Sequence, residues 1–403
     1  MARTADVVIV GGGVIGAACA YFLSREGVRV HLVERQYFSS GASRASHGGL
    51  ALIHSTAVEL RLAARSLQLW SEIAAEARVV TEYEVPGQVT LTDTPDELPL
   101  IEHQVAMLRA EGIQCDPLDA QQIRELEPCL APDVPGGSYI PSEAMVQSIY
   151  AAAAMADGAR RRGAVLETGS AVERIEQGSG GRIARVITSQ GAIDTPNVVL
   201  AGGVWTPALA APLGVRVPVI PRKGHVIITE ILPERIYRHK LQEVGYHKTL
   251  ESSFENTVVD HRQFGVAFAS EQKMAGNILI GTCREFVGFD MSTQATIGAA
   301  VAKRAARFVP ALANVRVLRI WTGLRPHTPD HLPILGPVPG VEGLYLATGH
   351  EGLGTTMAPI TGLLISQSIL GQPPALPLEP LSLTRFDAAP LPDHFQEALA
   401  ASV

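Results

Sequence analysis

Residues 7–16 read VVIVGGGVIG, an apolar run that leads directly into the pattern Gly11-x-Gly13-x-x-Gly16. The run predicts a buried β-strand, and the glycines predict a tight turn into a helix. Gly11 permits the turn, Gly13 lets the backbone approach a pyrophosphate, and Gly16 lets the helix pack against the strand. The helix N-terminus then presents unpaired N–H groups and a partial positive charge to phosphates. This stretch therefore predicts a βαβ unit that binds a dinucleotide.

A carboxylate closes the next apolar run, VRVHLVE at residues 28–34, and so stands at the end of a second predicted strand. Glu34 at this position can accept hydrogen bonds from both ribose hydroxyls of the nucleotide and would repel a 2′-phosphate. We therefore expect FAD or NAD and not NADP. A glycine-rich turn in a βαβ unit that binds no nucleotide is the alternative interpretation.

Length and composition are those of a two-domain enzyme. A chain of 403 residues exceeds the size of a single hydrophobic core. Its 46% hydrophobic content, 38 glycines and 27 prolines suit an α/β protein with many tight turns. The net charge is −7 and the basic residues are scattered, so we expect no nucleic-acid partner.

The four cysteines, Cys19, Cys115, Cys129 and Cys283, lie far apart and form no C-x-x-C pair. This spacing excludes a self-contained iron–sulfur cluster or cysteine-rich zinc site, and we expect no bound metal. The apolar N-terminus has neither the basic flank nor the cleavage site of a signal peptide, and no apolar run is long enough to span a bilayer. We therefore expect a cytoplasmic protein without a transmembrane segment.

The pattern of predicted helices and strands changes along the chain. Apolar periodicity predicts helices at residues 57–77, 99–111 and 145–162. Short apolar runs predict a hairpin at 181–193 and strands at 164–168, 171–175, 197–200, 226–230, 264–270 and 277–282. We expect an α/β (α+β overall) fold, in which a Rossmann-like dinucleotide domain is joined to a second, mostly antiparallel β-sheet domain for the substrate.

This alternation also predicts how the chain divides. The dinucleotide domain is expected to be discontinuous and to comprise residues 1–78, 140–216 and 321–386. The substrate domain is expected to comprise residues 79–139 and 217–320, and a loosely attached tail follows at 387–403.

Motifs distributed along nearly the whole chain resemble those of the D-amino acid oxidase/glycine oxidase family of FAD-dependent amine oxidoreductases. In chain order they are GGGVIG with Glu34, ASRASHGG at 42–49, AGGVW at 201–205, PRKGH at 221–225, GLRP at 323–326 and GHEGLG at 349–354. Each motif is modest alone, but their order and spacing are specific. The resemblance implies FAD as the cofactor and a small carboxylate-bearing amine as the substrate.

The GLRP and GHEGLG motifs together resemble one branch of that family most closely. This branch comprises the catalytic subunits of hetero-oligomeric dehydrogenases such as D-hydroxyproline dehydrogenase, opine oxidase and hydrogen cyanide synthase. It implies hydride transfer from the Cα of an amino or imino acid (D-hydroxyproline or D-proline-like, an opine, or glycine) to flavin N5, with FAD-containing and iron–sulfur partner subunits. The alternatives are a stand-alone glycine or D-amino acid oxidase that produces hydrogen peroxide, a non-catalytic FAD electron-transfer subunit, and an aromatic hydroxylase.

The resemblance also implies which residues contact FAD. They are Gly11, Gly13, Val14, Ile15, Gly16, Glu34, Arg35, Ser43, Arg44, Ser46, Gly48, Gly49, Val172, Ala201, Gly202, Trp205, Arg325, Gly352, Leu353, Gly354, Thr355 and Thr356. Some relatives attach the flavin through a histidine, but Ser46 and not His47 matches that position. Others use a cysteine where this chain has Gly323, so we expect FAD to be bound non-covalently.

Three residues are predicted to act on the substrate. Arg325 has the planar fork that binds a carboxylate through two parallel hydrogen bonds, although an ion pair between domains would also explain it. His350 and Glu351 precede a predicted helix with Thr355 or Thr356 as N-cap, Pro359 in its first turn and Gly371 past its end. Either could accept the ammonium proton of the substrate, or could serve a structural role instead.

Overall fold

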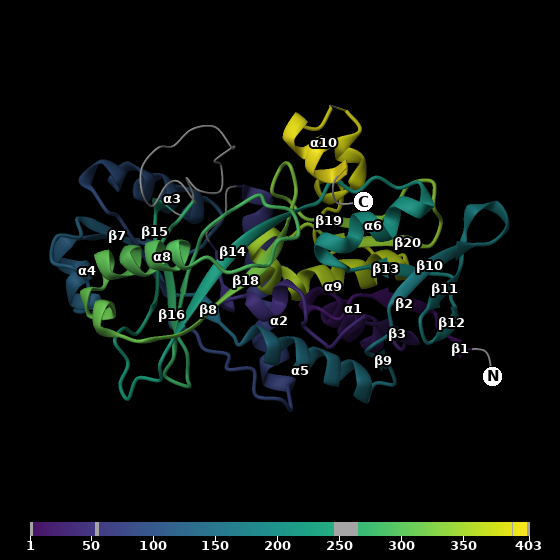
Figure 1. Cartoon of the computed structure of the whole chain (residues 1–403), viewed down its shortest axis with the longest axis horizontal. Helices are drawn as coiled ribbons and strands as arrows, with labels where there is room; N and C mark the ends of the chain where they lie inside the picture. Colours follow the sequence, from purple (N-terminus) through teal and green to yellow (C-terminus); the bar gives the residue numbers. More distant parts are fainter. Residues whose placement is uncertain (1–2, 53–55, 246–264, 389, 401–403) are drawn as a thin grey trace.

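The computed structural model describes residues 3–52, 56–245, 265–388 and 390–400. Two sheet-based halves lie side by side along the long axis of the molecule (Figure 1). One half holds a six-stranded sheet with a small four-stranded sheet beside it, and the other holds an eight-stranded sheet. This arrangement confirms the predicted fold class.

The six-stranded sheet has the order β19-β20-β13-β2-β3-β9, and its strands are parallel except for β19. Their bounds are β2 Val7–Val10, β3 Val30–Val33, β9 Val165–Glu167, β13 Val198–Leu200, β19 Ile334–Pro337 and β20 Leu344–Thr348. Strands β2 and β3 are buried along their whole length, as expected for parallel strands covered on both faces. The sheet takes its strands from all three chain segments predicted for the dinucleotide domain; the exact domain boundaries stay a prediction.

The side chains of β2 alternate between two cores, one on each face of the sheet. Val7 and Ile9 pack with helices α1 (Val14–Arg25), α5 (Ser148–Arg161) and α9 (Gly354–Leu370). Val8 and Val10 pack against the four-stranded sheet on the opposite face. That sheet has the order β1-β12-β11-β10, with β1 Arg3–Thr4, β10 Val172–Gln177, β11 Ile183–Thr188 and β12 Gly191–Asp194.

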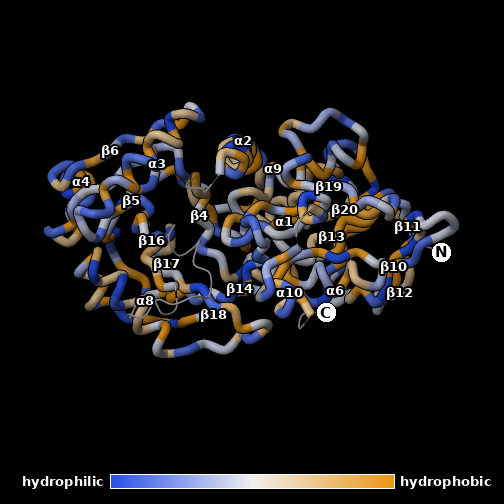
Figure 2. Tube along the Cα trace, turned by 90° about the horizontal axis from the view of Figure 1, so that it is seen from above, coloured by the Kyte–Doolittle hydropathy of each residue, from blue (hydrophilic) through white to orange (hydrophobic). Residues whose placement is uncertain are grey.

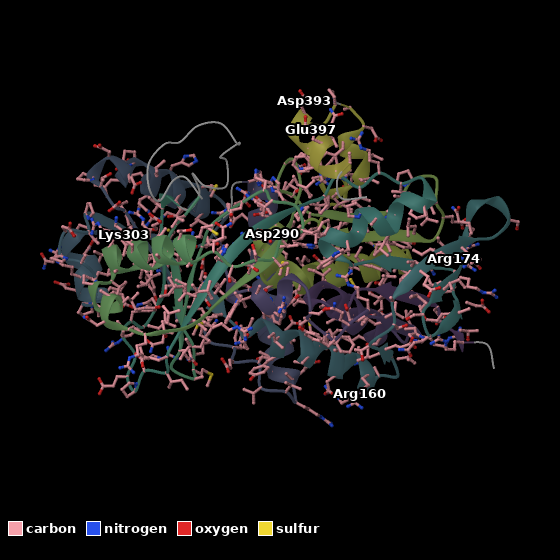
Figure 3. All side chains as sticks on the ribbon, in the orientation of Figure 1. Arg160, Arg174, Asp290, Lys303, Asp393 and Glu397 are labelled. Carbon is pink, nitrogen blue, oxygen red and sulfur yellow. The ribbon has the colours of Figure 1, made fainter. Side chains whose placement is uncertain are left out.

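The eight-stranded sheet has the order β18-β14-β17-β16-β15-β5-β7-β6 and is antiparallel except where β15 pairs with β5. Its strands are β5 Gln88–Leu91, β6 Asp116–Asp119, β7 Gly136–Ile140, β14 Ile220–Thr229, β15 Lys240–Glu243, β16 Ala269–Gln272, β17 Ile278–Gly281 and β18 Val317–His327. Helices α3 (Leu98–Ala110), α4 (Ala120–Leu126) and α8 (Ala295–Phe308) belong to the same half, and Lys303 of α8, labelled in Figure 3, is exposed. In the long β14–β18 ladder Arg222 lies directly opposite Arg325.

The remaining elements join or flank the two halves. They are α2 (Ala57–Glu76), α6 (Thr206–Ala210), α10 (Asp393–Ala400) and the short pair β4 (Gly49–Leu50) and β8 (Ala144–Met145). Hydrophobic residues gather along α2 and around β13 and β20 (Figure 2). Within the described residues, the stretch Glu351–Leu370 is apolar and long enough for a membrane span, but 61% of its apolar window is buried inside the fold.

Several sequence predictions of local structure need correction. The helix predicted from residue 145 begins at Ser148, because Met145 pairs with Gly49 in β8. The strand predicted at 264–270 begins only at Ala269, and residue 264 lies outside the described residues. The tail is not loosely attached, since α10 buries Phe395 against Ile220 of β14.

Candidate active site

A cavity of about 590 Å³ lies between the two halves and extends over the carboxyl ends of the parallel strands. In open α/β sheets this edge is where ligands bind. The sequence-predicted residues in its wall are Gly11, Gly13, Val14, Ile15, Glu34, Arg35, Ser43, Ser46, Gly48, Gly49, Val172, Ala201, Gly202, Trp205, Arg325, His350, Glu351, Gly352, Leu353, Gly354 and Thr355. The cavity therefore collects motifs that are separated by more than 300 residues in the sequence.

The glycine turn has the geometry that the sequence predicts. Gly11 has a φ of +115°, which L side chains rarely adopt, and a Cβ there would lie 2.5 Å from the carbonyl oxygen of Ala201. A Cβ at Gly16 would overlap the carbonyl oxygen of Gly11, so Gly16 sets the close packing of α1 on the turn. The N–H of Val14, the first residue of α1, donates to the Ser43 hydroxyl at 3.0 Å.

Glu34 lies at the cavity edge beside this turn. Its Oε2 accepts a hydrogen bond from the Gly12 N–H at 2.7 Å, and its Oε1 accepts one from the Gln36 N–H at 2.9 Å. Carboxylate oxygens have further lone pairs, so Glu34 can also accept from a ribose. The neighbouring Arg35 places its guanidinium 4.1 Å from the ring centroid of Trp205, which stacks on Phe289. These residues enclose the nucleotide end of the cavity.

Three predicted cofactor residues lie outside the cavity wall. Gly16 acts through helix packing, as described above, and Arg44 is exposed and does not line the cavity. The Thr356 hydroxyl bonds to the backbone of the 42–51 loop: it donates to the Gly49 carbonyl and accepts from the Ala51 N–H. Helix α9 begins at Gly354, so neither Thr355 nor Thr356 is its N-cap, and Pro359 lies in its interior. Gly371 does end it, in the left-handed conformation.

Arg325 reaches into the cavity from β18. It donates to the Cys283 carbonyl at 3.1 Å and to the Thr282 hydroxyl. On the neighbouring strand a Cβ at Gly224 would overlap the guanidinium, so this glycine makes the room that Arg325 occupies. Within the described part of the chain, no carboxylate forms a salt bridge with Arg325. Its charge is therefore available to an anion in the cavity.

Glu351 begins the 3₁₀ turn Glu351–Leu353, directly before α9, and its carboxylate contacts two side chains. Its Oε1 lies 3.4 Å from Arg222 Nη1 and its Oε2 lies 3.2 Å from His327 Nδ1. Burial alone would raise the pKa of this carboxyl, but Arg222 and His327 hold it well below its usual value. A carboxylate with so low a pKa is a weak proton acceptor, and the geometry favours the structural alternative for Glu351.

His350 also has a hydrogen-bond partner inside the protein. Its Nε2 lies 2.9 Å from the hydroxyl of Thr361, inside α9. Burial lowers the pKa of this histidine to about 3, so it is neutral near pH 7. The ring is thus fixed to the helix interior, and the structural alternative is favoured here as well.

Polar side chains in the eight-stranded sheet, or directly after one of its strands, form the roof of the cavity, and the sequence did not single them out. They are Gln88, Lys240, Gln242, Glu271 and Thr282. Lys240 pairs with Glu143 and Glu271 pairs with Lys273, each at 2.6 Å. His47 also lines this part of the cavity. One feature of the sequence could have indicated them: short strands such as KLQE contain charged residues, and all four residues of that strand are buried.

His225, Cys283 and Glu285 form a cluster of ligand types on the opposite face of β14. His225 Nδ1 lies 3.2 Å from Cys283 Sγ and 3.4 Å from Glu285 Oε2. However, the Gln294 N–H donates to His225 Nε2 at 3.1 Å, so the proton of the neutral ring resides on Nδ1. Nδ1 therefore has no lone pair for a metal. Lys223 Nζ lies 3.8 Å from Glu285 Oε2 of this cluster and forms a closer salt bridge, at 2.9 Å, with Asp290, which is labelled in Figure 3.

Comparison with known proteins gives a consistent result. The sequence profile described as "FAD dependent oxidoreductase" matches residues 6–368. A hydrogen cyanide synthase subunit of Pseudomonas aeruginosa is 30% identical, over 97% of this chain and 98% of its own length. A glycine oxidase of Geobacillus kaustophilus is 30% identical, over 96% and 98% respectively. A crystal structure of glycine oxidase from the same species superposes with a TM-score of 0.84 at 29% identity, covering 95% of this chain and 99% of the other.

Proposed function

The chain belongs to the FAD dependent oxidoreductase family, and from this membership we propose that it oxidises a small amino or imino acid as the catalytic subunit of a hetero-oligomeric dehydrogenase. Its cofactor is FAD, and its activity is the oxidation of amino acids. The proposal concerns the identity of the substrate and the role as a subunit.

The residues in the cavity fit FAD. The glycine turn and the N-terminus of α1 would hold the pyrophosphate, and Glu34 would hold the ribose. The 349–354 motif and the start of α9 would border the flavin. When bound there, FAD supplies the acceptor for a hydride, which carries two electrons.

The setting of Arg325 is the main support for a substrate that carries a carboxylate. It is a cation in the wall of the cavity, without a carboxylate partner among the described residues, and its neighbour Gly224 leaves space for its guanidinium. A substrate carboxylate would bind to this fork and so fix the position of its Cα. Candidates that carry a carboxylate beside an amine are D-hydroxyproline, D-proline, opines and glycine.

Two observations support the role as a subunit. The hydrogen cyanide synthase subunit matches this chain over nearly the full length of both. The chain also has no C-x-x-C pair with which to hold an iron–sulfur cluster for onward electron transfer, so an FAD-containing and an iron–sulfur partner would supply this path. The match to glycine oxidase favours the second candidate, a stand-alone oxidase that produces hydrogen peroxide.

A paired measurement tests both parts of the proposal. Glycine, D-proline, 4-hydroxy-D-proline and an opine are each mixed anaerobically with the FAD-loaded protein, and loss of flavin absorbance is followed. We expect at least one to reduce the flavin rapidly, and air to reoxidise it much more slowly. Absence of reduction by any amino or imino acid would refute the substrate assignment, whereas fast reoxidation by air would identify a stand-alone oxidase.

A further inference from the structure

We propose that His47 is the group that accepts the ammonium proton of the substrate. This inference rests on the proposed oxidation of an amino acid, and it gives to His47 the role that the sequence suggested for His350 or Glu351. His47 lies in the loop that connects the 3₁₀ turn Ala42–Ala45 to β4, and its ring lines the cavity.

His47 lies next to the site at which Arg325 would hold the substrate carboxylate. Its ring packs against Gly281, where a Cβ would lie 2.6 Å from Nε2. The next residue, Thr282, accepts a hydrogen bond from Arg325. The imidazole and the guanidinium therefore contact consecutive residues of one segment. The carboxylate and the amine of an α-amino acid sit on the same carbon, so a substrate held by Arg325 has its amine within the same small region.

His47 is the histidine of this cavity whose ring is not engaged by another side chain or by the backbone within the described residues. Nε2 is buried without a hydrogen-bond partner, and no partner is described for Nδ1. By contrast, His350 bonds to Thr361. Nε2 packs against Gly281 and has almost no accessible surface, so Nδ1 is the ring nitrogen that can meet a substrate. Nδ1 is an acceptor in the tautomer that carries the proton on Nε2, and a substrate N–H in the cavity would supply its donor.

The charges around His47 favour a neutral ring before substrate binds. Burial lowers the pKa of His47 to about 4, Lys273 and Arg325 act in the same direction, and Glu271 opposes them. A substrate carboxylate would neutralise Arg325 and so remove one of the two cations that disfavour the imidazolium. The same burial disfavours the ammonium form of the substrate. The low pKa makes the ring a weak proton acceptor while no substrate is bound. A bound carboxylate would raise the pKa of His47 by neutralising Arg325, and burial would lower the pKa of the substrate ammonium, so both changes favour transfer of the proton to the ring.

The step conserves charge and electrons. An N–H bond of the ammonium breaks, the proton bonds to the imidazole lone pair, and the amine keeps the electron pair of the broken bond. The product is a neutral amine, which is the form from which Cα can lose a hydride.

The variant His47→Gln tests this role, with His103→Gln, on the exposed face of α3, as the matched control. Anaerobic flavin reduction is measured by stopped flow from pH 6 to pH 10 with the most effective of glycine, D-proline and 4-hydroxy-D-proline. Near pH 7 we expect His47→Gln to be slower by about 100-fold, the scale of general base catalysis. The deficit should shrink at high pH, where the substrate amine loses its own proton. The control should match the wild type throughout.

Two further readouts separate proton transfer from a structural role. FAD content and the affinity for propionate, a carboxylate without an amine, should be unchanged in His47→Gln; propionate binding is followed by the flavin difference spectrum. Gly281→Ala displaces the His47 ring without removing it, and it should show the same pH-dependent deficit. This second variant replaces His47→Gln as the test if His47→Gln does not retain FAD. A deficit that is equal at every pH, wild-type rates, or lost propionate binding would each overturn the proposal. A wild type that no amino acid reduces would instead overturn the proposed function.

Discussion

Replacing Arg325 with lysine keeps a positive charge in the cavity but removes the planar fork. Arg325 is positioned by two hydrogen bonds, to the Cys283 carbonyl and the Thr282 hydroxyl, so that the rest of the guanidinium faces the cavity. A lysine ammonium is a point charge on a flexible stem and cannot make two parallel bonds to a carboxylate. It would also leave empty the space that Gly224 provides for the guanidinium.

The expected loss follows from the contact removed. One charge-assisted hydrogen bond to a carboxylate contributes about 2–3 kcal/mol. This corresponds to a decrease in kcat/KM of roughly 30- to 160-fold. Because Arg325 holds the substrate and does not lie in the glycine turn, the FAD content should be unchanged.

The assay is anaerobic reduction of the flavin at several substrate concentrations, together with the flavin-to-protein absorbance ratio. Arg319→Lys is the matched control, since Arg319 is exposed on the same strand. If Arg325→Lys keeps a kcat/KM near that of the wild type for a carboxylate substrate, Arg325 is structural and the substrate assignment loses its support. A variant that loses FAD would place Arg325 in the cofactor site instead.

Three other outcomes are expected. The purified protein should be yellow and release FAD into the supernatant on acid precipitation, because Ser46 and Gly323 stand at the positions of the covalent anchors; flavin that remains in the pellet would contradict this. Reduced enzyme should react slowly with oxygen and be turned over by an artificial electron-acceptor dye, and peroxide formation as fast as substrate oxidation would refute the role as a subunit. Glu351→Gln should lower the free energy of unfolding by about 3 kcal/mol at pH 7, because it removes the carboxylate from a buried ion pair with Arg222. Since the pKa of Glu351 is lowered in the folded protein, this contribution is complete above the ordinary glutamate pKa and is lost as the pH falls below it. Denaturant titrations of wild type and variant should therefore converge in acid, and a gap that persists there would contradict the reasoning.

The dinucleotide turn and its strands were predictable because their causes are local. Gly11 and Gly16 are required by contacts within a few residues, and the apolar runs around them decide which segments are buried strands. The position of Arg325 in the cavity wall was predictable from its motif together with the chemistry of the guanidinium. In these cases a residue type and its immediate neighbours are sufficient.

The roof of the cavity and the true setting of Glu351 were not predictable, because they depend on pairings between distant segments. Glu351 meets Arg222, which is 129 residues away, and this contact changes a candidate base into half of a buried ion pair. Gln88 and Lys240 come together only because β5 and β15 pair in parallel. Which face a short strand presents depends on such register, and the sequence alone does not specify it.

The long ladder between β14 and β18 places two arginines, Arg222 and Arg325, directly across from each other. Glu351 forms a salt bridge with Arg222, and the charge of Arg325 also helps to hold the pKa of Glu351 low, so one carboxylate serves two arginines. A small carboxylate bound to Arg325 would add a second anion beside this pair. Any such carboxylate, substrate or not, should raise the melting temperature, so protection against heat offers a screen for ligands that does not depend on turnover.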